Sequence, residues 1–139
     1  KSIILGSIEE FLYAGKRALE EAIKQAKVGN RVGHISKTMQ DIIESSGYSI
    51  VRSLVGHGVG RSLHEEPEVP GFLVGDILRT PVLKEGMTLA IEAIYNMGER
   101  DVAYANNDGW TIKTKDGSLS AVFEKTIVVA RKGPVILTS

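Results

Sequence analysis

Two of the three histidines in this chain lie in one glycine-rich segment, Gly56 to Glu68. Glycines on both sides of His57 leave its imidazole unobstructed and allow a substrate or another backbone segment to approach closely. This setting suits a metal ligand or a proton-transfer group. The alternative is a structural histidine in an ordinary glycine-rich turn. A phosphate-binding loop is disfavoured because no Lys-Ser/Thr pair follows Gly56, Gly58 and Gly60 at the required place.

Two glutamates lie inside apolar segments that are typical of β-strands. Strand alternation places Glu92 on one face with Ala90 and Ile94, which favours a buried, charge-compensated carboxylate over a plain surface residue. Glu124 shares its face with Val122 in the same way. One imidazole and two carboxylates would form a nitrogen and oxygen ligand set for Mn, Fe, Co or Zn. The other interpretation is two solvent-facing glutamates and a structural histidine.

Composition excludes several classes of protein. The chain has 139 residues, which we interpret as one domain, 1–139. Its 17 Lys and Arg balance 17 Asp and Glu, so no basic field supports general nucleic-acid or membrane binding. Cysteine is absent, which excludes disulfides, zinc ribbons and a cysteine nucleophile. Without a membrane-spanning run or a signal segment, we expect a cytoplasmic protein.

The elements that must position these residues are two helices followed by short strands, an α+β arrangement with an antiparallel sheet. A capping-box pattern at Ser7 predicts a helix over about 7–27, and a second helix is expected from Val32 to Ser46. The residues before Ser7 are of β type, so we expect the chain to begin inside or just before a strand. The predicted strands are Tyr48–Val51, Thr88–Tyr95, Trp110–Thr114, Ala121–Ala130 and Val135–Leu137.

Two turn sequences set the expected pairing of the last three strands. Lys115-Asp116-Gly117 and Arg131-Lys132-Gly133 are typical of hairpin turns, so these strands should pair antiparallel with one another. Between Leu54 and Glu85 the sequence has little periodicity, and we expect a long functional or mobile loop there.

Three segments resemble motifs of the bacterial type of methionine aminopeptidase. His57–Pro70 resembles its HGxGxxxHExPxV segment, and Gly86–Glu92 resembles its GMxxxIEP strand. Asp108–Thr111, followed by Ser118–Thr126, resembles the C-terminal DGWT…SAQxEHT motif of the family. The segments occur in family order and at family spacing over nearly the whole chain.

The resemblance implies a pita-bread fold and a dinuclear metallohydrolase that removes the initiator methionine from new proteins. It implies that His57, Glu92 and Glu124 are metal ligands, with Glu124 of the bridging type, for two divalent ions of Co, Mn, Fe or Zn. Such ions polarise the scissile carbonyl and lower the pKa of a bridging water, whose proton Glu92 would move. His64 matches the histidine that contacts the substrate peptide group. Leu63 and Trp110 match residues that line the methionine pocket; without the resemblance they are an ordinary packing residue and a core anchor.

The resemblance also indicates what the chain lacks. The family's remaining ligands are aspartates on a β-hairpin that precedes the segment resembling Ser2–Gly6, so the chain corresponds to the C-terminal half of the fold. We therefore expect a truncated, weakly active or inactive chain. Half a fold leaves a sheet face or edge unpaired, so we expect a homodimer or pairing with a missing N-terminal half.

Departures from the family motifs leave two alternatives. Ala93, Val122 and Lys125 stand where the family has Pro, Gln and His, which makes a noncatalytic binding module of the same fold a real alternative to the enzyme. A proline-directed peptidase of that fold is the other alternative. The Trp110 segment and the short connection from His64 to Glu92 favour the methionine enzyme over it.

Overall fold

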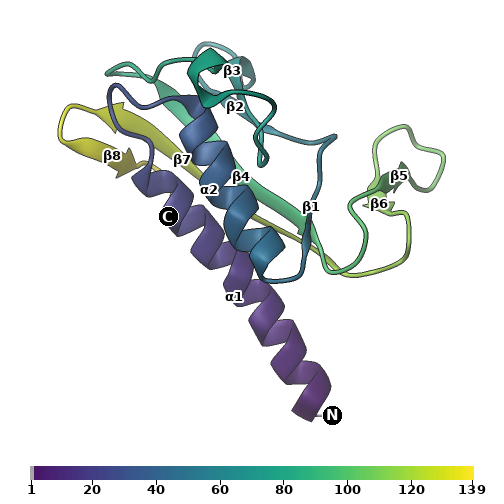
Figure 1. Cartoon of the computed structure of the whole chain (residues 1–139). Helices are drawn as coiled ribbons and strands as arrows, with labels where there is room; N and C mark the ends of the chain where they lie inside the picture. Colours follow the sequence, from purple (N-terminus) through teal and green to yellow (C-terminus); the bar gives the residue numbers. More distant parts are fainter. Residues whose placement is uncertain (1) are drawn as a thin grey trace.

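The structure is a computed structural model that describes residues 2–139, and of Ser2 and Ile3 it describes the backbone alone. Two helices, α1 (Ser2–Lys24) and α2 (Val32–Ser45), lie side by side against an antiparallel sheet (Figure 1). The strands are β1 (Ser49–Ile50), β2 (Gly56–Gly58), β3 (Glu65–Val69), β4 (Thr88–Asn96), β5 (Val102–Tyr104), β6 (Ile112–Thr114), β7 (Ser120–Ala130) and β8 (Gly133–Ile136). The turn η1 (Ile77–Arg79) precedes β4. The expected α+β class, two helices followed by an antiparallel sheet, is confirmed.

The main sheet has six strands in the order β3-β2-β4-β7-β8, with β1 paired to the far end of β4. Its centre is the β4–β7 ladder, which runs without a break from Thr88 opposite Val128 to Asn96 opposite Ser120. Every pairing is antiparallel. Strands β5 and β6 form a separate two-stranded arm, visible to one side of the main sheet in Figure 1.

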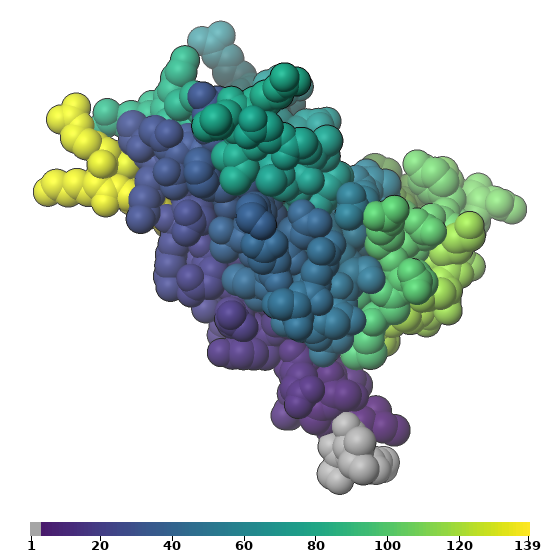
Figure 2. All heavy atoms as spheres, in the orientation of Figure 1, coloured from purple at the N-terminus to yellow at the C-terminus, as the bar shows by residue number. Residues whose placement is uncertain are grey.

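The helices cover one face of the sheet and leave the other face without a helix. Leu89, Ile91 and Ala93 of β4 belong to the core cluster with buried residues of both helices, whereas Glu92 points to the opposite face. This confirms the alternation expected for β4. The amino-terminal turns of α1 extend beyond the sheet, where Ile4 and Leu5 are exposed (Figures 1 and 2).

A buried tyrosine joins α1 to the central strand. Tyr95 of β4 is fully buried and packs against the ring of Phe11, with centroids 4.6 Å apart. Its hydroxyl donates to the backbone oxygen of Phe11 and accepts from the N–H of Gly15 at 3.1 Å. A Cβ at position 15 would overlap the Tyr95 ring and hydroxyl, so glycine is what allows α1 to approach β4 this closely.

Three predictions about elements were wrong. Helix α1 already includes residues 2–6, so Ser7 is no N-cap; its hydroxyl donates to the Ile4 carbonyl oxygen inside the helix. Lys1 lies outside the described residues. Strand β6 pairs with β5 rather than with β7, because the short connection 105–111, held by Asp108, returns the chain alongside β5. The segment 54–85 contains β2, β3 and η1 rather than one long loop.

Other element predictions held. Helix α2 starts at Val32 and ends one residue before Ser46, and Gly47 follows with φ +89°, as a terminating glycine should. The β7–β8 hairpin forms around Arg131 and Lys132 as expected. Neither helix is apolar over a stretch long enough to cross a bilayer, among the residues that the structure describes.

Candidate metal centre

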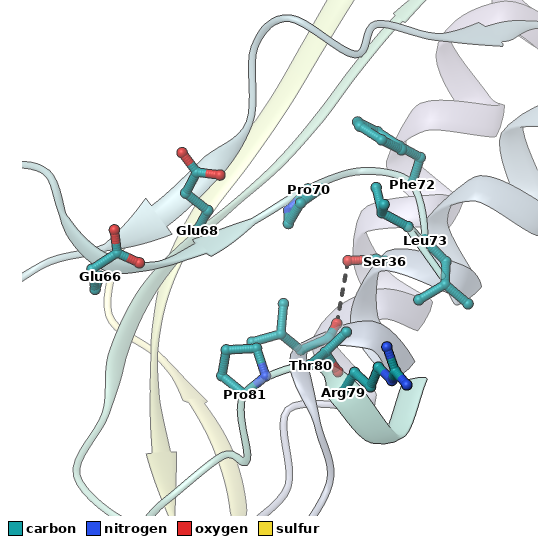
Figure 3. A pocket seen from close by; sticks show the side chains of 11 residues that line it. Ser36, Glu66, Glu68, Pro70, Phe72, Leu73, Arg79, Thr80 and Pro81 are labelled. Atoms are coloured by element: carbon teal, nitrogen blue, oxygen red, sulfur yellow. Dashed lines mark hydrogen bonds between the residues drawn. The ribbon is translucent and has the colours of Figure 1, made fainter. Parts of the chain in front are cut away.

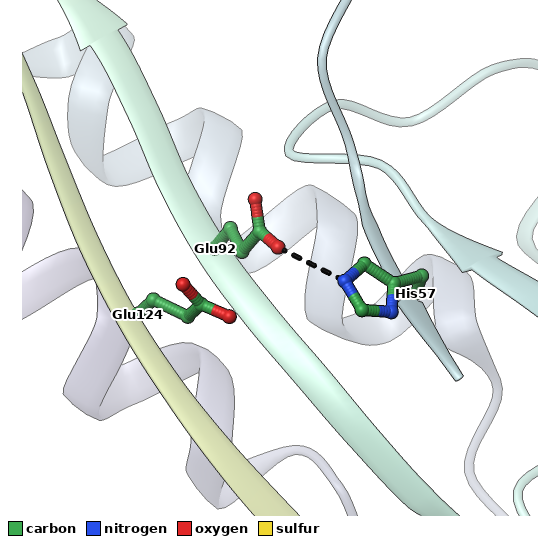
Figure 4. A group of neighbouring side chains, drawn as sticks. All are labelled: His57, Glu92 and Glu124. Carbon is green, nitrogen blue, oxygen red and sulfur yellow. Dashed lines mark ion pairs between the residues drawn. The ribbon is translucent and has the colours of Figure 1, made fainter. Parts of the chain in front are cut away.

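Three neighbouring strands bring one histidine and two glutamates together on the open face of the sheet. His57 comes from β2, Glu92 from β4 and Glu124 from β7 (Figure 4). Glu92 and Glu124 are direct cross-strand partners, and His57 is the partner of Ala90. Each side chain offers one ligand atom that lies within 4.8 Å of the other two. This spacing fits a shared cation.

The imidazole of His57 is oriented by the backbone. Its Nδ1 lies 2.8 Å from the carbonyl oxygen of Gly58, which can only accept, so Nδ1 carries the proton in this contact. Nε2 is then directed at Glu92, whose Oε1 lies 3.4 Å away. A neutral imidazole in this tautomer presents its Nε2 lone pair to the centre of the group, as a metal ligand must.

The surroundings of the Glu92 carboxyl disfavour its charged form. Burial raises the pKa of Glu92 above its ordinary value, the neighbouring carboxylate of Glu124 raises it further, and His57 acts in the opposite direction. Two carboxylates in direct opposition repel each other unless a positive charge stands between them. A divalent cation would relieve both effects, and a nitrogen with two carboxylate oxygens is a donor set that such ions accept. The residues therefore fit a divalent cation.

The group is enclosed on one side and open on the other. The side chains of His57 and Glu92 are only 12% and 15% exposed, whereas Glu124 on β7 is exposed. A water molecule or a peptide can therefore reach the group from the side of Glu124. The enclosed side strengthens electrostatic interactions with any ion held there.

Two glycines make room for His57 between its neighbouring strands. A Cβ at Gly56 would overlap the carbonyl oxygen of Ala90, and a Cβ at Gly58 would overlap the carbonyl of Glu66. Both obstacles are backbone atoms and cannot rotate away. The pattern Gly-His-Gly is thus required for β2 to fit between β3 and β4, in agreement with the close approach expected from the sequence.

His64 lies against the group. Its ring and that of His57 are 4.1 Å apart between centroids. The loop that carries His64 is tied by Glu65, whose Oε1 accepts from the N–H of Ser62 at 2.9 Å. Leu63 is 72% exposed and lines the solvent side of the same loop.

Trp110, unlike His64, lies away from the metal group. It lies in the loop between β5 and β6 and is 85% exposed, so it is not the core anchor that its uniqueness would suggest. Asp108 holds this loop by accepting from the N–H groups of Trp110 and Thr111 and from the Thr111 hydroxyl. These bonds lower the pKa of Asp108 to about 2. The structure brings His64 to the metal group and does not bring Trp110 into contact with it.

Away from this group, a hollow of about 470 Å³ lies between α2, β3 and the η1 segment (Figure 3). It has mainly apolar walls, with Glu66, Glu68 and Arg79 at its rim and Ser36 bonded to its own helix. It contains no imidazole. It therefore lacks the mixed donor set of the group around His57.

The sequence indicated all three residues of the group but neither strand β2, which carries His57, nor strand β3, which pairs with β2. Strands β2 and β3 lie in the segment that was expected to be a loop. The signal available was the Gly-His-Gly pattern, whose small residues permit close strand packing.

Comparison with known proteins gives consistent results. Residues 3–131 match the model of metallopeptidase family M24. A methionine aminopeptidase of Aquifex aeolicus is 43% identical over 130 residues, which are 94% of this chain and 50% of that protein. The chain spans about half the length of the curated relatives it matches.

Solved structures agree on the fold. A crystal structure of methionine aminopeptidase from Thermotoga maritima aligns with a TM-score of 0.88 and 44% identity, over 94% of this chain and 51% of that one. A prolidase from Pyrococcus horikoshii aligns with a TM-score of 0.69 and 25% identity, over 94% of this chain and 31% of that one. These matches confirm the expected pita-bread fold.

Proposed function

The chain belongs to metallopeptidase family M24, and we propose that it forms the C-terminal, metal-binding part of a methionine aminopeptidase. The observation that carries this proposal is the group of His57, Glu92 and Glu124, whose ligand atoms lie within 4.8 Å of one another. The similarity to methionine aminopeptidases supports the choice within the family, since it reaches 44% identity against 25% for the prolidase above.

In this proposal His57, Glu92 and Glu124 hold the cation, drawn from Co, Mn, Fe or Zn, and two ions share the complete site. When bound, such a cation would polarise the scissile carbonyl and lower the pKa of a water molecule. His57 is kept in the ligating tautomer by Gly58. Glu92 would be the proton carrier, because its carboxylate lies within the group that would hold the cation and is therefore next to any water bound there.

The substrate is the N-terminus of a peptide or of a newly made protein in the cytoplasm. His64, whose ring lies tilted against that of His57, would donate to the carbonyl of the peptide group and keep it next to the cation. Leu63 and Trp110 are exposed apolar side chains that would close on the methionine side chain. Burial of that side chain against them would select methionine over smaller residues, since each buried CH₂ stabilises by about 0.8 kcal/mol.

The test is release of methionine from Met-Ala-Ser by the chain with added Mn²⁺ or Co²⁺, alongside Ala-Pro as the substrate of a proline-directed peptidase. Because Trp110 is the only tryptophan, its fluorescence reports peptide binding directly. We expect a fluorescence change with Met-Ala-Ser that Ala-Ala-Ser does not produce, and slow methionine release that EDTA and Glu92→Gln abolish. Preferential cleavage of Ala-Pro, or neither binding nor release with either cation, would contradict the proposal.

A further inference from the structure

One connection of the fold stands apart from the main sheet. This arm, residues 97–119, joins the end of β4 to the start of β7 and contains β5 and β6 (Figure 1). Among residues 2–139, none of β5 or β6 belongs to the apolar core cluster. A hollow of about 230 Å³ lies between the arm and Ser53 and Leu54 of the main body. Because no apolar core holds the arm, its direction depends on the hydrogen bonds at its base.

The base of the arm interrupts the backbone ladder. Backbone bonding from the sheet reaches the N–H of Met97, which donates to the carbonyl oxygen of Leu119 at 2.8 Å. It resumes in the arm, where the N–H of Lys115 donates to the carbonyl oxygen of Asp101 at 3.0 Å. Between these two bonds, the N–H groups of residues 98 and 99 are bonded by side chains instead.

Asp116 and Ser118 supply these side-chain bonds. The N–H of Gly98 donates to the Ser118 hydroxyl oxygen at 3.1 Å, and the N–H of Glu99 donates to Oδ2 of Asp116 at 2.8 Å. The other carboxylate oxygen, Oδ1, accepts from the hydroxyl of Ser118 at 2.6 Å and from its N–H at 2.9 Å. Asp116 therefore joins the two segments that form the base of the arm.

These bonds also keep the carboxylate charged. The hydroxyl of Ser118, followed by the N–H groups of Glu99 and Ser118, lowers the pKa of Asp116 to about 2. Hydrogen bonds to an ionised carboxylate are shorter and stronger than those between neutral groups. The base of the arm is thus held by charge-assisted bonds at neutral pH.

Gly98 leaves the space that Asp116 occupies. A Cβ at position 98 would overlap Oδ2 of Asp116 and would crowd the Ser118 side chain. The backbone at Gly98 does not have a positive φ, so glycine is needed here for space rather than for conformation. The sequence therefore provides both the carboxylate and the room for it.

A small rotation at the base moves the far end of the arm by a distance that matters for contact. From Asp101 to Ala105 the arm extends by about 13 Å, so a rotation of about 10° displaces its far end by about 2 Å. Atoms in van der Waals contact are only about 3.5–4.0 Å apart, and a displacement of 2 Å or so ends such a contact. Trp110 lies in the loop at this far end.

We propose that Asp116 is a positioning residue, which fixes the arm against the sheet and thereby sets the place of Trp110 and the selectivity for methionine. This inference rests on the proposed function, in which Trp110 closes on the methionine side chain. A fixed arm would lower the cost of ordering Trp110 when a peptide binds. Asp116 lies outside the group of His57, Glu92 and Glu124, so it acts on the substrate side chain and leaves the cation site unchanged.

The first test measures the position of the arm by electron spin resonance. The chain contains no cysteine, so Tyr104→Cys in β5 and Lys132→Cys at the β7–β8 turn can carry a pair of nitroxide labels. Both side chains are exposed. We expect one narrow distribution of distances, which Asp116→Asn widens by about 2 Å, since an amide offers only one acceptor oxygen where the carboxylate offers two.

Two further variants sharpen this test. Gly98→Ala displaces the same carboxylate from the other side and should widen the distribution as Asp116→Asn does, with no further widening when the two are combined. Asp101→Asn is the matched control, because Asp101 contributes only its backbone oxygen to the base of the arm. Circular dichroism equal to that of the unmodified chain establishes that each variant is folded. A distribution that stays narrow in folded Asp116→Asn would overturn the proposal.

The second test measures binding of Met-Ala-Ser in the presence of Mn²⁺, followed by the fluorescence of Trp110. Asp116→Asn should raise the dissociation constant about tenfold, because Trp110 must then be ordered on binding, whereas Asp101→Asn should not change it. Calorimetry should give the same Mn²⁺ affinity for all three chains.

Each result decides a separate point. A widened distribution with unchanged affinity for Met-Ala-Ser would overturn the link between Asp116 and selectivity. Loss of Mn²⁺ binding in Asp116→Asn would overturn it as well, since the variant would then disturb the whole sheet. An unmodified chain that binds no Met-Ala-Ser would overturn the proposed function and the role in selectivity together, while the distance distributions would still decide whether Asp116 holds the arm.

Discussion

Replacing Gly15 by alanine should destabilise the protein, although the same change in a free helix would stabilise it. Alanine is favoured over glycine inside a helix by about 1 kcal/mol. At this position, however, the new Cβ would overlap the hydroxyl and two ring carbons of Tyr95, and both sides of the contact are closely packed. Overpacking of this kind costs about 1–3 kcal/mol.

The hydrogen bonds at Tyr95 add to the loss. If the ring moves to admit the methyl group, its bonds to Phe11 and Gly15 lengthen, and each contributes about 1 kcal/mol. The balance is a net destabilisation of about 1–4 kcal/mol. For a chain of this size that lowers the melting temperature by roughly 4 °C for each kcal/mol.

Gly6→Ala is the matched control, because Gly6 lies in the same helix and has no atom within 4 Å of its added Cβ. It should raise stability by up to about 1 kcal/mol. Urea unfolding of the two variants beside the unmodified chain measures the difference in sign. Tyr95→Phe removes the hydroxyl that overlaps the new methyl group, so in that background Gly15→Ala should be less harmful. A Gly15→Ala chain as stable as Gly6→Ala would refute the reasoning that Tyr95 and Gly15 fix the helix against the strand that carries Glu92.

The remaining predictions concern charges and hydrogen bonds. The pKa of Glu92 is raised in the folded chain, so its contribution to stability is present below the ordinary carboxyl pKa and is lost as the pH rises through the folded value. In EDTA, Glu92→Gln should therefore be more stable than the unmodified chain. Urea unfolding should show that this difference in free energy grows from pH 4 to pH 8. Tyr95→Phe should lower the free energy of unfolding by about 1–3 kcal/mol in the same assay, because it leaves a buried carbonyl without its donor. Asp108→Asn should lower the fluorescence anisotropy of Trp110 and leave Mn²⁺ binding unchanged, since Asp108 holds the Trp110 loop and lies outside the metal group. An unchanged anisotropy would show that the loop is held by something else.

The sequence predicted those parts of the fold in which the local pattern decides the structure. Both helices and the strands β4 and β7 carry apolar periodicity, and each lies where that pattern predicts it, apart from the start of α1. The start of α1 was misjudged because Ile3 and Ile4 have strand propensity, and continuation from an established helix overrides a propensity of this size.

The local sequence did not predict which strands pair with one another. Strand β2 has no apolar periodicity, and its extended conformation comes from hydrogen bonds to β3 and β4 on either side. Whether β6 pairs with β5 or with β7 depends on how the 105–111 connection folds, which the turn sequence at 115–117 does not specify.

For the candidate site as well, the sequence predicted the residues but not their geometry. Residue types and alternation indicated His57, Glu92 and Glu124 as a ligand set, because carboxylates on apolar faces need a partner. The direct opposition of Glu92 and Glu124 and the contact of Nδ1 with Gly58 depend on strand register and became visible only in three dimensions. Trp110 could not be placed from sequence, since its loop stands on an arm outside the main sheet.

The central claim is that His57, Glu92 and Glu124 together hold a divalent cation, and calorimetric titration of the chain with Mn²⁺ tests it most directly. Loss of groups that merely orient ligands lowers metal affinity about 10–100-fold, so loss of a ligand itself should lower it by about 100-fold or more. We predict measurable binding to the unmodified chain, a loss of that size in His57→Ala and in Glu124→Gln, and no change in Glu66→Gln, which alters an exposed carboxylate outside the group. Equal affinity in His57→Ala and the unmodified chain would contradict the account.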